Sequence, residues 1–175
     1  MTLYSPSTQK IAIASLDDVT LCVEAQYNPK ELQFDKAVNW TPHQKAGNAS
    51  DGLQLEFTGQ SQPRSTSIDF LFDGVEENDS QSVIDNIDKL QRLAAVRDPQ
   101  GTEDPLRRPH HCVLVWARHK SVPPLDDKLF SKPAFQCVIA QVTVKYQVFS
   151  PDGLPLRATT TLKLQEATRV TMARP

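Results

Sequence analysis

The chain has 175 residues, and its 19 Lys and Arg nearly balance 21 Asp and Glu, which leaves a formal net charge of −2. This balance offers no electrostatic attraction to nucleic acid or to an anionic membrane, so we expect neither as a direct partner. The length fits one domain that can bury a core without a disulfide or a metal ion.

The first elements are short and alternate in polarity. Residues 10–16 (KIAIASL) and 20–27 (TLCVEAQY) predict a β-hairpin. Asn28-Pro29 ends the second strand, because proline cannot donate to a strand ladder and restricts the residue before it. Residues 32–40 (LQFDKAVNW) alternate more weakly, and we interpret them as an arm that packs on something other than the chain's own core.

The middle of the chain predicts two half-buried strands, a helix and a buried strand. Residues 53–59 (LQLEFTG) and 65–73 (STSIDFLFD) alternate between apolar and polar side chains, as antiparallel strands do. Apolar residues recur at helical spacing from about residue 79 to residue 96, after several good N-cap residues. Residues 112–118 (CVLVWAR) form an apolar run typical of a buried strand.

The last part of the chain is the most regular. Residues 134–149 predict a long strand, SPDG (150–153) predicts a turn, and the chain then returns with strict alternation through residue 165. This hairpin has one polar face. About seven strands and one helix predict a mainly β (α+β) domain, a small rolled barrel or sandwich with one flanking helix.

Few residues suggest a reactive or metal-binding site. Three widely spaced cysteines without a CxxC pair favour free thiols in a reducing compartment, namely Cys22, Cys112 and Cys137. His110 and Cys112 are the best metal candidates, with His43 and His119 as further ligands, but two neighbouring ligands are too few for zinc and we expect no metal.

Other polar side chains are weaker candidates for functional sites. Glu56 and Asp69 could form a carboxylate pair on neighbouring strands, and Arg107 and Arg108 could bind an anion beside His110 and His111. Their polar surroundings favour a solvated face and an exposed loop instead. No nucleotide-binding, hydrolase or metalloprotease motif is present, so we expect no enzyme and no cofactor. Trp116 lies in an apolar run and is expected in the core, whereas Trp40 is expected to anchor an interface.

Several segments occur together in a characteristic order: YNPKELQFDKAVNW, LEFTG, STSIDFLFD, VIDNIDKLQRLA, VLVWA and VKYQVFSPDGLPLRATTTLKL. From about residue 8 to residue 168 they resemble the tube-type domain of contractile injection system proteins, which are relatives of phage tail tube and baseplate components. We therefore expect a tube-type domain over residues 1–168 and a C-terminal tail over 169–175. Many relatives carry a LysM module after this domain, and a chain that stops at Pro175 has no room for one.

The resemblance implies a rolled β-sheet whose copies form a hexameric ring around a channel. That ring would join the spike hub to the inner tube as a tube initiator, with the baseplate wedge as a further candidate partner. The absence of a signal peptide predicts folding in the cytoplasm, before assembly into a released or membrane-anchored particle. Residues expected at subunit or stacking interfaces are Tyr27, Asn28, Pro29, Trp40, Phe149, Pro151, Asp152 and Gly153. Residues expected to face the lumen are Thr143, Lys145, Arg157, Thr159, Thr161 and Lys163.

Two other functions compete with the ring. One is a small monomeric β-barrel that binds peptidoglycan or another glycan through Trp40 and the His110 loop. The other is an enzyme that uses Glu56, Asp69 or His111. Neither needs a hexamer, so the oligomeric state discriminates between them and the ring.

Overall fold

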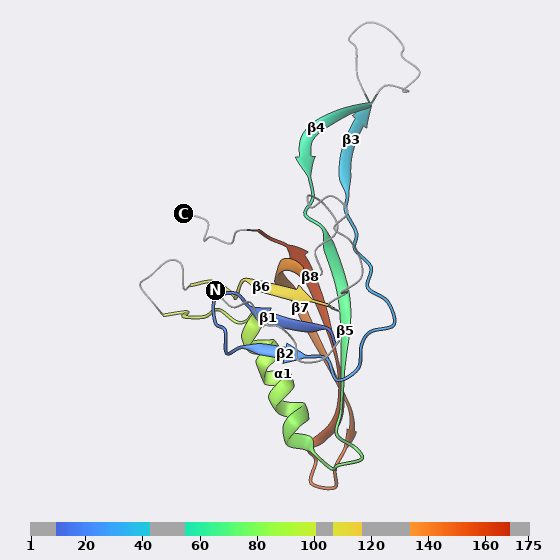
Figure 1. Ribbon diagram of the computed structural model, residues 1–175, viewed down its shortest axis with the longest axis vertical. Helices are drawn as coiled ribbons and strands as arrows, with labels where there is room; N and C mark the ends of the chain where they lie inside the picture. Colours follow the sequence, from blue (N-terminus) through green and yellow to red (C-terminus); the bar gives the residue numbers. More distant parts are fainter. Residues whose placement is uncertain (1–9, 43–54, 101–106, 117–133, 169–175) are drawn as a thin grey trace, which may run out of the picture.

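The computed structural model describes residues 10–42, 55–100, 107–116 and 134–168 (Figure 1). Most of its regular structure is β, which confirms the mainly β (α+β) prediction with one helix. In chain order the elements are β1 (Ala12–Ser15), β2 (Cys22–Glu24), β3 (Val38–Pro42), β4 (Leu55–Ser61), β5 (Ser65–Asp73), α1 (Ser80–Ala94), β6 (Cys112–Val115), β7 (Ala134–Phe149) and β8 (Pro155–Glu166).

Six strands form one antiparallel sheet in the order β2-β1-β6-β7-β8-β5, and β3 pairs with β4 in a separate hairpin. The sheet is rolled, because one core cluster contains residues from β1, β2, β5, β6, β7, β8 and α1. The side chain of Gln26, just after β2, links the two outer strands of the roll. Its Nε2 donates to the Asp73 carbonyl at 2.8 Å and its Oε1 accepts from the Asp73 N–H at 2.6 Å.

Helix α1 flanks the rolled sheet and packs against it through one face, because its apolar residues share that face. Val83, Ile87, Leu90 and Leu93 are buried, at the spacing that the sequence predicted. Asp79 caps the helix by accepting the Ser82 N–H at 3.0 Å. The helix is slightly shorter than predicted.

The polarity of β8 matches its predicted alternation. Its buried residues are Leu156, Ala158, Thr160, Leu162 and Leu164. The pairing of β7 with β8 shifts between Ile139 and Gln141, so Ala140 forms a bulge. Because a bulge reverses the alternation, Ile139 packs in the core before it, and Val142 and Val144 pack against the core after it.

The structure corrects the interpretation of residues 32–40. Leu32 and Phe34 pack against the chain's own core, with the Phe34 ring 4.9 Å from Phe135 and 5.6 Å from Trp116. The expectation that this segment packs elsewhere is therefore wrong for its first half. Trp116, which was expected in the core, is partly buried and packs against the core. Only β3, from Val38 onward, leaves the roll.

Two hairpins extend from the roll at opposite ends of the molecule. The β3–β4 hairpin projects from one end, and the β7–β8 turn lies at the other, beyond the start of α1 (Figure 1). Among the described residues, no helix has the length and apolar character needed to cross a membrane.

Candidate assembly surfaces

One face of the sheet formed by β5, β8 and β7 is polar. Cross-strand pairing places Thr161 between Asp69 and Thr143, and Thr159 between Leu71 and Lys145. Because neighbours in register share a face, all six residues predicted to face a lumen lie on this side. We call it the polar face. Its opposite side carries the buried residues of the roll.

Local bonds hold the acidic groups of the polar face. Thr161 Oγ1 donates to Asp69 Oδ1 at 2.6 Å, and Arg157 Nη2 donates to Asp73 Oδ2 at 2.5 Å. The bond from Arg157, aided by the N–H of Val75, lowers the pKa of Asp73. Lys145 and Lys163 make no ion pair with another described residue, so this face carries cationic groups available to a neighbour.

The turn of the β7–β8 hairpin has the predicted geometry. The Ser150 carbonyl accepts the Gly153 N–H at 2.9 Å, and Gly153 has a φ of 80°, which favours glycine. Pro151 and Asp152 are exposed within this turn. We call the end of this hairpin the tip. Its exposed apolar side chains are Tyr146, Val148, Phe149 and Leu154.

The β3–β4 hairpin, which we call the arm, carries a second exposed apolar surface. Trp40 is 56% exposed and its ring lies 5.7 Å from that of Phe57, its register partner. Leu55 is exposed on the same side of the hairpin as Phe57, because side chains two apart share a face. Val38 is also exposed, beyond a shift in the strand register. Trp40 was predicted from the sequence as an exposed anchor, whereas Phe57 was not. The alternation of Leu55 and Phe57 was the signal that could have identified it.

The corner after β2, at residues 27–29, stabilises the fold of the chain and also contributes to its exposed surface. Asn28 Oδ1 accepts the Ile11 N–H at 2.9 Å, which fastens the corner to the strand at the start of the roll. Tyr27 is 53% exposed and Pro29 is half-buried. The corner therefore presents one large exposed side chain, that of Tyr27.

Arg108 does not form the anion site considered from the sequence. Its two Nη atoms donate to Asp17 at 2.8 and 3.0 Å, and Arg97 lies 3.5 Å from the same carboxylate. Burial tends to raise the pKa of Asp17. The hydrogen bonds from Arg108 and from the His111 N–H, with both positive charges, outweigh it and lower the pKa to about 2. The cluster therefore ties together segments far apart in the chain.

The histidines and cysteines have structural partners. His110 is buried and its Nδ1 lies 2.8 Å from Ser15 Oγ, whereas His111 Nε2 lies 2.7 Å from the Ala167 carbonyl oxygen. Cys112 and Cys137 are buried register partners, and burial raises the pKa of both thiols, that of Cys137 to about 12. No group of three metal-ligating side chains occurs within the described ranges, and His43 and His119 lie outside them.

The structure does not bring the other candidate site residues together. Glu56 lies on β4 and Asp69 on β5, and these strands belong to different sheets. The carboxylate pair that the sequence allowed but did not favour is therefore not formed, and the placement of these two residues on neighbouring strands is wrong. Trp40 lies on the arm, whereas His110 is buried beside β1, so they do not share an open glycan surface.

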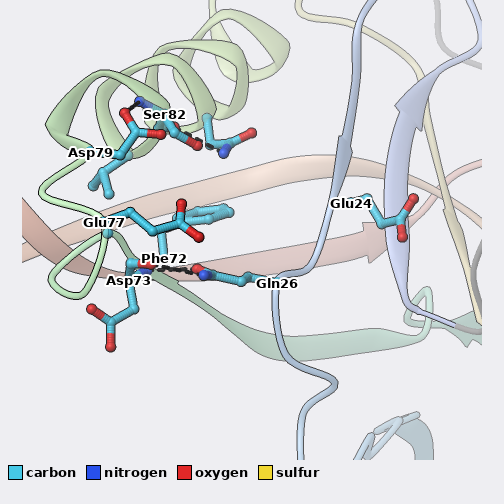
Figure 2. Close-up of a pocket in the computed structure, with 10 residues that line it drawn as sticks. Glu24, Gln26, Phe72, Asp73, Glu77, Asp79 and Ser82 are labelled. Carbon is cyan, nitrogen blue, oxygen red and sulfur yellow. Dashed lines mark hydrogen bonds between the residues drawn. The ribbon is translucent and has the colours of Figure 1, made fainter.

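A hollow of about 170 Å³ lies between the start of α1 and the ends of β2 and β5. Figure 2 shows Glu77 beside Asp73 and Asp79 there. Asp73 and Asp79 already accept hydrogen bonds from Arg157 and Ser82. Two of the carboxylates that line this hollow therefore have structural roles: Asp79 caps the helix and Asp73 bonds to Arg157 on β8.

Comparison with known proteins agrees with the topology. Residues 3–173 match the family model described as contractile injection system tube protein. Among curated proteins, the comparison found no significant match.

Proposed function

The chain belongs to the contractile injection system tube protein family, and from this premise we propose that it forms a hexameric ring that joins the spike hub to the inner tube and initiates tube growth. Its role in the tube is structural. We further propose residues 1–168 as the assembling domain, and a protein without catalytic activity.

The observation that carries this proposal is the polar face of β5, β8 and β7. Its reverse side is covered by the core and α1, so only the polar side can line a water-filled channel. In the proposed ring, these strands surround the lumen, which is lined by Thr143, Lys145, Arg157, Thr159, Thr161 and Lys163.

The two apolar hairpins support contacts along the tube axis. The arm and the tip lie at opposite ends of the molecule, so contacts through both would extend an assembly in one direction (Figure 1). We assign Trp40 to the arm contact, and Phe149, Pro151, Asp152 and Gly153 to the tip contact. Tyr27 would supply a lateral contact beside Asn28 and Pro29.

Co-expression with the spike and tube proteins of the same gene cluster, followed by electron microscopy, tests this function. The expected product is a six-fold ring that contains this chain and caps the spike. The proposed partners are the hub, the inner tube protein and the baseplate wedge, in a particle assembled in the cytoplasm and then released or membrane-anchored. A monodisperse monomer that binds neither the hub nor the tube would overturn the proposal and favour a glycan-binding module.

A further inference from the structure

One buried hydroxyl group joins segments that lie 95 positions apart in the chain. Ser15, the last residue of β1, is buried, and its Oγ accepts the N–H of Asp17 at 3.0 Å and that of Asp18 at 2.9 Å. The same oxygen lies 2.8 Å from Nδ1 of His110, just before β6. A serine hydroxyl has two lone pairs and one hydrogen atom. Because both lone pairs already accept an N–H, the hydroxyl must donate its hydrogen to Nδ1.

This bond fixes the protonation state of His110. An Nδ1 that accepts a hydrogen bond carries no proton, so the neutral imidazole has its proton on Nε2. A proton added at Nδ1 would make this nitrogen a third N–H group facing the same oxygen, alongside those of Asp17 and Asp18. Ser15 Oγ has no lone pair left for it. Protonation of His110 is therefore incompatible with this contact.

The surroundings of His110 also disfavour its charged form. The residue is 8% exposed, and its backbone N–H donates to the Leu93 carbonyl in the last turn of α1 at 3.3 Å. Burial lowers the pKa of the imidazole, the positive charge of Arg97 lowers it further, and together they outweigh the carboxylates of the β1–β2 turn. The charged and titratable neighbours are Asp17 and Asp18 in the β1–β2 turn, Arg92, Arg97 and Asp98 at and after the end of α1, Arg108 before β6, and Cys112 in β6.

A hollow beside His110 gives solvent a path to the imidazole. It has a volume of about 390 Å³, and His110 lines it. Its other lining residues come from the β1–β2 turn and from the end of α1, namely Asp18, Leu21, Arg92, Ala95, Val96, Arg97 and Asp98. A proton can therefore reach His110 without prior unfolding of the core.

We propose that these contacts form an acid-sensitive latch whose proton sensor is His110. The neutral imidazole fastens the β1–β2 turn to the start of β6 and to the end of α1, and protonation at Nδ1 releases the turn. Asp17 stays ionised in mild acid and keeps its two bonds to Arg108, so the release is local and the roll stays folded. The inference does not depend on the proposed hexamer.

Release of the turn would change the surface at this end of α1, which lies away from the tip (Figure 1). Leu21 is buried on the wall of the hollow, whereas Val96 on the same wall is already exposed. A released turn would uncover Leu21 beside Val96. Mild acid would therefore create a small apolar surface that is absent at neutral pH.

The pH window of the latch follows from the direction of the shift. His110 in a released turn should titrate near the ordinary pKa of 6.5, whereas its pKa in the closed latch is lower. The released state therefore binds more protons, so the latch is fully closed above pH 6.5 and opens as pH falls through the window below it. The equilibrium constant for release should rise by up to tenfold for each pH unit in that window, because one proton is taken up.

Hydrogen exchange of the full chain, followed by NMR and corrected for the intrinsic effect of pH, tests the latch. The protection factors of the Asp17 and Asp18 N–H groups should fall by up to tenfold per pH unit in mild acid, while that of Leu90 in α1 stays constant. His110→Asn places an amide oxygen near the position of Nδ1 and takes up no proton, so it should abolish this pH dependence. His111→Asn is the matched control and should retain it, because the His111 imidazole bonds to Ala167 instead.

A direct measurement on the wild type needs no substitution. Long-range ¹H–¹⁵N correlation spectra distinguish protonated from unprotonated imidazole nitrogens, and at neutral pH His110 should show a bare Nδ1 and a protonated Nε2. A protonated Nδ1 at neutral pH, or a His110 pKa at or above 6.5, would overturn the latch. Protection of Asp17 and Asp18 that does not change while His110 titrates would overturn it as well. None of these outcomes depends on whether the chain forms a hexamer.

Discussion

The two halves of β7 differ in what surrounds them. Near Cys137 the strand lies between β6 and β8, and its core-facing side chains are fully buried. Near Lys145 it pairs with another described strand on one side only, and beyond it Phe149 is 58% exposed. The first half lies in the core of the roll, whereas the second half and the arm present groups that no other described residue covers.

The largest effect is expected from the buried core of the roll. Phe70 is fully buried, so Phe70→Ala should lower the free energy of unfolding by about 3–5 kcal/mol through lost burial and a cavity. Urea denaturation measures this change. A loss as small as that of an exposed phenylalanine would contradict the division of the molecule into a buried core and exposed assembly surfaces.

Low pH should lower the free energy of unfolding through protonation of Asp17. Its folded pKa of about 2 lies below the ordinary value of 3.8, so its stabilisation is complete above pH 4 and is lost as pH falls toward 2. The loss should be on the order of 2 kcal/mol. Asp17→Asn is the control, since it should remove this part of the pH dependence. Parallel stability profiles for the two proteins would contradict the assigned role.

Gly153→Val should separate folding from assembly. A valine at a φ of 80° is strained by about 1–2 kcal/mol, but no atom lies within 4 Å of the added Cβ, so the strain should stay in the turn. Thermal unfolding should show a modest loss while ring formation fails. Gly153→Asn is the matched control, since asparagine tolerates this conformation better. Normal rings with valine would show that the tip is not at an interface.

The smallest effect on the monomer is expected at Phe149. Phe149→Ala should change the free energy of unfolding by less than about 0.5 kcal/mol, because the side chain is mostly exposed. Binding to partner rings, measured by co-sedimentation, should nevertheless weaken. A stability loss comparable to that of Phe70→Ala would place Phe149 in the monomer core instead.

Local periodicity explains which elements were predictable from the sequence. The helix and the β7–β8 hairpin follow from repeats of 3.6 and 2 residues, which depend on near neighbours. The bonds of Gln26 to Asp73 and of Arg108 to Asp17 join residues 47 and 91 positions apart, and no spacing in the sequence indicates them. The alternation in the sequence predicted a polar face on the β7–β8 hairpin. It did not predict which strand lies beside this hairpin, because that depends on the register of three strands.

The arm and the tip are unlike each other, and under the proposed function this would give a stack of subunits a direction. A subunit with a damaged tip and an intact arm would add to one end of a stack and then leave no site for the next subunit. Such a variant would act as a chain terminator in a polymerisation. A minor fraction of Gly153→Val subunits in a cell that also makes the wild-type chain would therefore shorten many assemblies, far out of proportion to its abundance.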